Sequence, residues 1–137
     1  MADKLSLKLL TPTRPAILRE VDSVNLTAQE GEVGILPGHA AFLASLAPGP
    51  AVLRDGESAE TWALSGGIVE IHDDVVTVLV QAAERASEID VERARRRLTE
   101  LETRLREHEM SPAELARTEA SISKQQIRIA VAGRSAS

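Results

Sequence analysis

The sequence predicts an α+β protein, in which an N-terminal antiparallel β-sandwich is followed by a C-terminal antiparallel two-helix hairpin. Short apolar runs separated by Gly, Pro and Asp fill the chain up to about residue 86, as in small all-β domains. From residue 89 onward the apolar residues recur every three or four positions, which is the period of an amphipathic helix. We therefore assign residues 1–87 to a sandwich domain and residues 88–137 to a helical hairpin.

The strand half opens with leucines at positions 5, 7 and 9, and their alternation with polar residues gives the segment one apolar face. No helix-length segment separates the later apolar runs, which disfavours a parallel α/β sheet. On composition alone, the glycine-rich segment 31–38 is expected to form a tight loop between strands. Further strands are expected at residues 21–26, 51–54, 60–64, 67–71 and 75–80.

The helical half divides at Glu109–Met110 into two predicted helices. The first has Asp90 as its N-cap and one narrow apolar stripe, at residues 91, 94, 98, 101 and 105. Ser111 and Pro112 start the second helix, which we expect to end near Val131, before Gly133. Its small side chains form a row that we expect to pack on the first helix: Ala113, Ala116, Ala120, Ser123, Ile127 and Ala130.

Composition and charge exclude several classes of function. The net charge of −5 disfavours general nucleic-acid binding, and Phe42 and Trp62 are the only aromatic residues, too few for a base-stacking surface. Cysteine is absent and the three histidines are widely spaced, so no metal site is predicted. No catalytic residue is assigned, because His39 has no marked acid or nucleophile as a partner. Residues 1–88 are acidic and residues 89–137 slightly basic, which indicates two surfaces with different partners.

Two separate motifs give the sequence a family resemblance. Residues 31–40 read Gly-Glu-Val-Gly-Ile-Leu-Pro-Gly-His-Ala, and residues 64–70 read Leu-Ser-Gly-Gly-Ile-Val-Glu. Both closely resemble the signatures of the epsilon subunit of rotary (F-type) ATP synthases of the bacterial and chloroplast type. The segments Leu9–Pro12, Leu46–Gly49, Val76–Leu79, Ala83–Ala86 and Ile89–Asp90 agree with this family in the same order, so the resemblance covers residues from about 5 to about 131.

The resemblance implies the same sandwich and hairpin, and it implies a role. Members of this family are non-catalytic central-stalk (rotor) subunits of the proton- or sodium-translocating ATP synthase. They bind the gamma subunit and the ring of c subunits, turn with that rotor and couple ring rotation to ATP synthesis. In many members the C-terminal helices meet the alpha and beta subunits and inhibit ATP hydrolysis.

Three positions match the family's contact with the c ring and gamma: Glu32, Gly34 and His39. The loops of c subunits are commonly basic or rich in amides, so the acid at Glu32 suits them electrostatically. Without the resemblance, Glu32 is an ordinary solvated carboxylate and His39 a structural histidine. On the second helix, Arg117, Lys124 and Arg128 match basic residues that contact the beta subunits in an extended hairpin. Without the resemblance, these three residues are interpreted as part of a solvated charged face of the helix.

The segment from Ile89 to Ala94 resembles a motif that binds ATP in some family members. The residues that this match implies are Ile89, Asp90, Arg93 and Ala94, joined by Lys124 and Arg128 of the second helix. Asp90 would accept from the adenine amino group or a ribose hydroxyl, and Arg93 would pair with phosphate. Glu100 stands where some ATP-binding members have an arginine, and it would repel a triphosphate. The alternative is structural: Asp90 caps the helix and Ala94 lies in its apolar stripe. No cofactor other than this regulatory ATP is expected.

Two other functions stay open on the residues alone. One is a stand-alone β-sandwich that binds a small ligand and uses the helices to form oligomers; the other, less favoured, is a small hydrolase that uses His39. The chain has no apolar run of the length that a membrane helix needs, and residues 1–4 lack the apolar core of a signal peptide. We therefore expect a peripheral protein on the cytoplasmic face of the bacterial plasma (inner) membrane, held there only through its complex.

Overall fold

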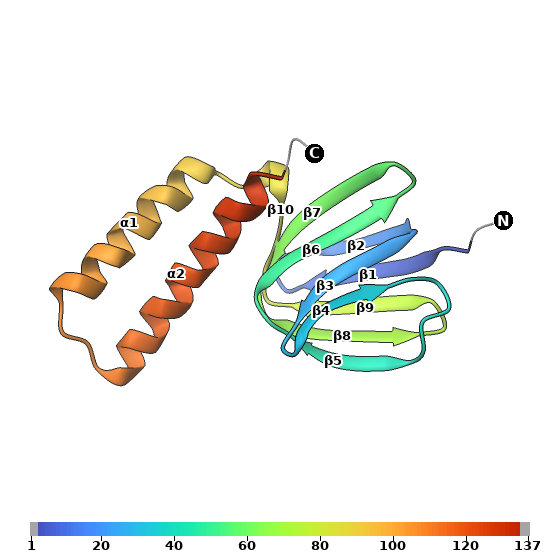
Figure 1. Cartoon of the computed structure of the whole chain (residues 1–137), viewed down its shortest axis with the longest axis horizontal. Helices are drawn as coiled ribbons and strands as arrows, with labels where there is room; N and C mark the ends of the chain where they lie inside the picture. Colours follow the sequence, from blue (N-terminus) through green and yellow to red (C-terminus); the bar gives the residue numbers. More distant parts are fainter. Residues whose placement is uncertain (1–2, 135–137) are drawn as a thin grey trace.

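The computed structural model describes residues 3–134. Within this range ten strands form a sandwich, and two antiparallel helices stand beside it as a hairpin (Figure 1). The predicted fold class is thereby confirmed. The strands are β1 (Leu5–Thr11), β2 (Arg14–Val21), β3 (Ser23–Ala28), β4 (Gly31–Ile35), β5 (Phe42–Leu46), β6 (Gly49–Asp55), β7 (Ser58–Leu64), β8 (Gly67–His72), β9 (Val75–Val80) and β10 (Ala83–Arg85). A short 3-10 helix, η1 (Ala86–Glu88), leads to α1 (Val91–Glu107) and α2 (Pro112–Ala132).

The strands are hydrogen-bonded in the order β10-β7-β6-β3-β5-β8-β9-β1-β2, and β4 pairs with β3 alone. Neighbours run antiparallel except β1 and β9, which pair in parallel from Ser6 opposite Val75 to Leu10 opposite Leu79. The alternating leucines of β1 point into the sandwich, where they join an apolar core. The largest fully buried side chains of that core are Trp62, Leu5, Leu26, Ile35, Ile71, Val24, Val69, Val76 and Val78.

The prediction of a tight loop over residues 31–38 is wrong for its first half. Residues 31–35 form β4, because their backbone pairs with β3, from Ala28 opposite Gly31 to Val24 opposite Ile35. The turn comes later, where His39 N donates to Leu36 O at 3.1 Å. Gly31 and Gly38 have φ values of 135° and 86°, a region that favours glycine, so these two residues bracket the strand. β2, β5 and β10 are also absent from the sequence prediction.

The caps predicted for the helices are confirmed, and the predicted apolar stripe of α1 is confirmed except at its end, where Leu105 is 39% exposed. Asp90 Oδ1 accepts a hydrogen bond from Arg93 N at 3.1 Å at the start of α1, and Ser111 Oγ accepts from Glu114 N at 3.2 Å at the start of α2. Ala94 and Leu101, from the predicted stripe of α1, are buried.

The predicted packing of the small row of α2 on α1 is wrong. Apart from the half-buried Ile127, the members of that row are exposed. Thr118 and Gln125 are buried instead, and Ile122 and Ile129 are half-buried. The N-terminal half of α2 stands away from the sandwich and beside α1 (Figure 1). The Thr118 hydroxyl lies 3.5 Å from Met110 Sδ in the turn between the two helices. The physical reason is area, because a row made mostly of alanines offers little apolar surface to bury.

The C-terminal half of α2 packs on the sandwich (Figure 1). Val131 is buried in a small apolar cluster with Ala63 of β7, Ala86 of η1 and Ile89, and Ile127 packs at its edge. α2 therefore lies between α1 and the sheet, and its last turns hold the hairpin on the sandwich.

Gly67 lies at the start of β8, where the chain passes close to β9. A Cβ atom at this position would lie 2.0 Å from the backbone oxygen of Leu79 and 2.9 Å from Val80 Cγ1. Since the obstacle is backbone, a side chain at position 67 forces β8 and β9 apart.

We expect Gly67→Ala to lower the free energy of unfolding by about 1–3 kcal/mol, as overpacked sites do. Urea unfolding followed by circular dichroism measures this change in the free energy of unfolding. Gly34→Ala is the matched control in a strand, since its Cβ would meet Asn25 Nδ2 at 3.4 Å, an ordinary contact. That variant is expected to change stability by less than about 1 kcal/mol. Equal destabilisation by both variants would contradict the steric explanation.

Candidate functional site

An open polar groove of about 1020 Å³ lies where α1, α2 and the β10–η1 segment meet. Its lining side chains come from two acids of that segment, from α1 with its N-cap, and from α2. They are Glu84, Glu88, Asp90, Arg93, Arg96, Arg97, Glu100, Lys124, Gln125 and Arg128. The structure thus brings together four of the six residues of the expected ATP site: Asp90, Arg93, Lys124 and Arg128.

The other two residues of that set, Ile89 and Ala94, are 9% and 0% exposed and do not line the groove. Ile89 belongs to the apolar cluster under α2, so both side chains serve packing. The Asp90 carboxylate is exposed, but one of its oxygens already accepts the capping hydrogen bond from Arg93 N. Its other oxygen remains available to a ligand.

The cations of the groove fall into two groups. Arg97 pairs with Glu100 at 3.2 Å and Arg128 pairs with Glu84, so these two charges are balanced within the chain. Within residues 3–134, Arg93, Arg96 and Lys124 make no such ion pair. With five cationic and four acidic side chains, the lining has a small excess of positive charge, which favours an anionic ligand, and Glu100 reduces that excess.

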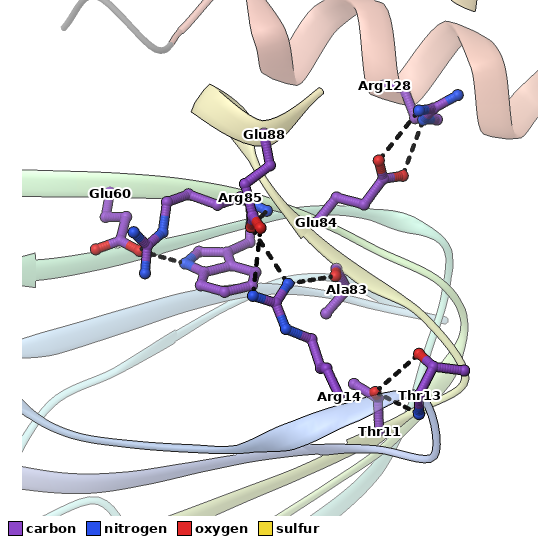
Figure 2. A network of polar contacts seen from close by, with 10 residues as sticks. Thr11, Thr13, Arg14, Glu60, Ala83, Glu84, Arg85, Glu88 and Arg128 are labelled. Atoms are coloured by element: carbon purple, nitrogen blue, oxygen red, sulfur yellow. Dashed lines mark hydrogen bonds and ion pairs between the residues drawn. The ribbon is translucent and has the colours of Figure 1, made fainter. Parts of the chain in front are cut away.

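Arg128 also holds α2 on the sandwich. Its Nε lies 2.8 Å from Glu84 Oε1, its Nη2 donates to Glu84 Oε2 at 3.1 Å, and its Nη1 donates to Gln125 Oε1 at 2.9 Å. The Arg128 side chain is only 17% exposed, so this two-pronged contact is shielded from solvent (Figure 2). Arg117 is exposed about three turns from Arg128 on α2 and does not line the groove. The expected inhibitory set is therefore divided, with Lys124 and Arg128 together and Arg117 apart.

Beneath the groove a polar network fixes the segment that carries Glu84 (Figure 2). Arg14 of β2 donates to Ala83 O at 3.1 Å and to Glu88 Oε1 at 3.2 Å. The guanidinium carbons of Arg14 and Arg85 lie 5.1 and 5.3 Å from the centroid of the Trp62 ring, within range of cation–π attraction. Sequence reasoning missed this network, because its members are scattered over β2, β7, β10 and η1.

Glu60 and Glu88 are the acids of this network. Burial alone would raise the pKa of Glu60, but hydrogen bonds from Arg19 and Trp62 and the charges of Arg19 and Arg85 outweigh it and lower that pKa. The pKa of Glu88 is lowered chiefly by the hydrogen bond that Arg85 N donates to it, at 3.0 Å. Both carboxylates are therefore charged and paired at neutral pH.

On the sandwich, the structure keeps Glu32 and Gly34 on one strand and sets His39, the third residue expected to contact other subunits, beyond its end. Glu32 is exposed at the start of β4, where Asn25 Nδ2 donates to its Oε1 at 3.3 Å, and Gly34 is exposed further along the strand. His39 is half-buried beyond the other end of β4, with Nδ1 2.8 Å from Ala40 O and its ring edge against Phe42. Glu32 lines a groove of about 540 Å³ with Glu30, Leu43 and other residues from the start of β4 and from β5.

An exposed apolar strip on the outer face of the sandwich was also missed. Ile68 of β8 and Leu79 of β9 are direct cross-strand neighbours and are 47% and 49% exposed. Leu10 of β1, which is half-buried, is the next partner across the sheet. Three apolar side chains in register on adjacent strands are typical of a surface that another protein covers. Their alternation with buried residues looks like an ordinary strand in the sequence, so nothing in the pattern marks them.

Within the part of the chain that is described, no cluster of three or more His, Asp or Glu side chains could hold a metal ion. Neither α1 nor α2 is both long and apolar enough to cross a membrane.

Comparison with known proteins identifies the class. Residues 4–86 match the family model described as the ATP synthase, Delta/Epsilon chain, beta-sandwich domain. The chain is 41% identical over 136 residues to the ATP synthase epsilon chain of Citrifermentans bemidjiense, covering 99% of both chains. It is 39% identical over 130 residues to that of Halalkalibacterium halodurans, covering 95% of this chain and 98% of the relative.

Solved structures agree with this class. A chain of the mitochondrial ATP synthase of Euglena gracilis, in an assembly of OSCP, F1 and the c-ring, superposes with a TM-score of 0.70 at 25% identity, covering 95% of this chain and 78% of that one. A chain of the central stalk and c-ring of the Tetrahymena thermophila enzyme shares the fold, with a TM-score of 0.63 at 18% identity and coverage of 96% and 98%. The chain belongs to the family of ATP synthase epsilon chains. It is accordingly a subunit of that complex and not a free-standing enzyme.

Proposed function

We propose that this protein is the rotor subunit that couples rotation of the c ring to ATP synthesis, and that its helices restrain ATP hydrolysis. The observation that carries this proposal is a likeness to epsilon chains that extends over both the sandwich and the hairpin. A stand-alone ligand-binding sandwich has no need of similarity in the helices. The same proposal places the protein at the cytoplasmic face of the bacterial plasma membrane, attached through the complex.

In this proposal the sandwich binds gamma and the c ring. The apolar strip at Leu10, Ile68 and Leu79 offers area to a protein partner, and gamma is the partner we assign to it. The acidic groove at Glu30 and Glu32 suits the polar loops of c subunits. His39 lies at the far end of β4 from Glu32 and is assigned to the edge of the gamma contact.

The test is co-purification from membranes in which the tagged protein replaces the resident epsilon chain. Alpha, beta, gamma and the c ring are expected to be recovered with it. Glu32→Lys is expected to reduce recovery of the c ring severalfold, because it places a cation against basic or amide-rich loops. Glu57→Lys, an equal charge reversal in the exposed β6–β7 turn, is the control. Protein recovered without gamma would overturn the proposal and favour the stand-alone ligand-binding sandwich.

Inhibition is assigned to the basic residues of α2, which would meet the alpha and beta subunits when the hairpin extends. Arg117 and Lys124 are exposed and have no ion pair within residues 3–134, so they are ready to bind acidic partners. Extension breaks the contact between Arg128 and Glu84, and Arg128 then becomes available to the same partners. The small, exposed row of α2 leaves that face clear for a neighbour at close range.

Deletion of residues 111–137 is expected to raise membrane ATPase activity severalfold, since it removes the helix assigned to inhibition. The double substitution Arg117→Gln with Lys124→Gln should raise it in the same direction while keeping the hairpin. Arg106→Gln serves as the control, because it removes an exposed positive charge from α1 rather than from α2. ATPase assays of inverted vesicles measure all three, and unchanged activity in both the deletion and the double variant would contradict inhibition while leaving the assembly role intact.

Regulatory ATP binding is the third part of the proposal. The polar groove has room for a nucleotide, and Arg93, Arg96 and Lys124 supply unpaired cations for its phosphates. Glu100 weakens the site, so the affinity is expected to be low. A nucleotide held between α1 and α2 would favour the docked hairpin by mass action.

Calorimetry of the full-length protein should detect ATP binding only at high micromolar to millimolar concentration. Removing the opposing charge with Glu100→Gln is expected to tighten it about two- to fivefold, the effect of one exposed charge pair. Glu102→Gln is the control, because Glu102 is exposed on the same helix and does not line the groove. An absence of heat in both the wild type and Glu100→Gln at millimolar ATP would remove the nucleotide site.

A further inference from the structure

A second cavity, of about 310 Å³, lies between α2 and the sandwich. It borders the polar groove, since Glu84, Lys124 and Arg128 line both. Its walls come from both parts of the molecule: Pro48, Ala63, Leu64 and Ala82 on the sandwich side, and Ala120 and Ile127 on α2. The space exists because three of these wall residues are alanines.

The walls of this cavity are almost entirely hydrocarbon. The hydroxyl of Ser65, which reaches the wall, is already used: it accepts hydrogen bonds from Gln81 N and Ala82 N at 3.0 Å and donates to Gly66 O at 3.2 Å. A polar ring such as a nucleobase would therefore find few partners inside. Lys124 is exposed at the mouth and has no ion pair within residues 3–134, so a positive charge stands beside an apolar space.

We propose that this cavity binds the alkyl chain of a medium-chain carboxylate, with the carboxylate on the Lys124 ammonium group. The cavity volume of about 310 Å³ lies at the small end of the range for ligand pockets, about 300–1,000 Å³, and suits an alkyl chain of medium length. The apolar walls provide the affinity, and Lys124 selects an anionic head. This inference concerns a lipid-derived ligand, and it holds whether or not the helices inhibit ATP hydrolysis.

The ligand would also act on the position of the hairpin. Since α2 and the sandwich each provide part of the wall, the site is complete only when the hairpin is docked. Binding therefore stabilises the docked arrangement by mass action, and the stabilisation grows with ligand concentration. Amide exchange in the last turns of α2 should slow when the ligand is present.

The experiment is titration of the full-length protein with hexanoate, octanoate and decanoate below their micelle concentrations, followed by calorimetry and by hydrogen exchange. Affinity is expected to rise by up to about fourfold per methylene and to level off once the chain fills the cavity. Exchange in residues 120–131 is expected to slow with octanoate. The absence of binding at millimolar octanoate and decanoate would overturn the proposal.

Two pairs of variants locate the ligand. Ala120→Leu fills the cavity and is expected to weaken octanoate binding at least tenfold, whereas Ala116→Leu, exposed on α2 outside the cavity, should leave it unchanged. Lys124→Gln should weaken the binding of octanoate about two- to fivefold and leave the binding of octanol unchanged. Arg106→Gln is the control for this variant. Exchange rates in the ligand-free variants verify that the hairpin remains docked.

Two results would exclude this site. Octanoate that binds Ala120→Leu and Ala116→Leu equally, with the hairpin docked in both, lies somewhere other than the cavity. Adenosine that displaces octanoate, or that binds more tightly, would assign the space to the base of a nucleotide and overturn the alkyl proposal.

Discussion

The anchoring of residues 83–89 determines how the two parts of this molecule are joined. On the sandwich side, Arg14 spans from β2 to the Ala83 carbonyl and to Glu88, and Trp62 lies beneath Arg14 and Arg85. On the helix side, Glu84 receives Arg128. Because neighbouring residues of one short segment point to opposite partners, the same backbone both closes the sandwich and receives α2. Loss of order in this segment would release the helices and open the β2 edge together.

Local patterns were sufficient for the outline of this fold and insufficient for its contacts. The caps at Asp90 and Ser111 depend on neighbours within one turn, and the sequence predicts both of them correctly. β4 escapes the prediction because its pairing with β3 overrides the glycine content of the segment. The packing of α2 was predicted wrongly because α2 packs on both α1 and the sandwich. The spacing of apolar residues along one helix does not show which side of it faces each partner. Of the six residues expected at the nucleotide site, only Ile89 and Ala94 lie outside the groove, because both are buried in apolar packing.

The three surfaces assigned to α2 share residues, which makes their occupancies interdependent. Lys124 lines both the polar groove and the apolar cavity and also belongs to the set assigned to beta contact, and Arg128 cannot hold Glu84 and an acidic partner at the same time. Ligands of the docked hairpin and partners of the extended one therefore compete, although they touch different faces of the helix. Such competition requires only that α2 has two positions, docked and extended, and that each ligand or partner binds one of them more tightly than the other.

The parallel pairing of β1 with β9 has a consequence for biosynthesis. The first strand made by the ribosome has its partner at residues 75–80, so it waits unpaired on that edge until most of the sandwich has been synthesised. Contacts so distant in sequence form slowly, whereas the helices that follow can form locally as they emerge. The nascent chain thus leaves the leucines of β1 without their full core until residues 75–80 have been synthesised.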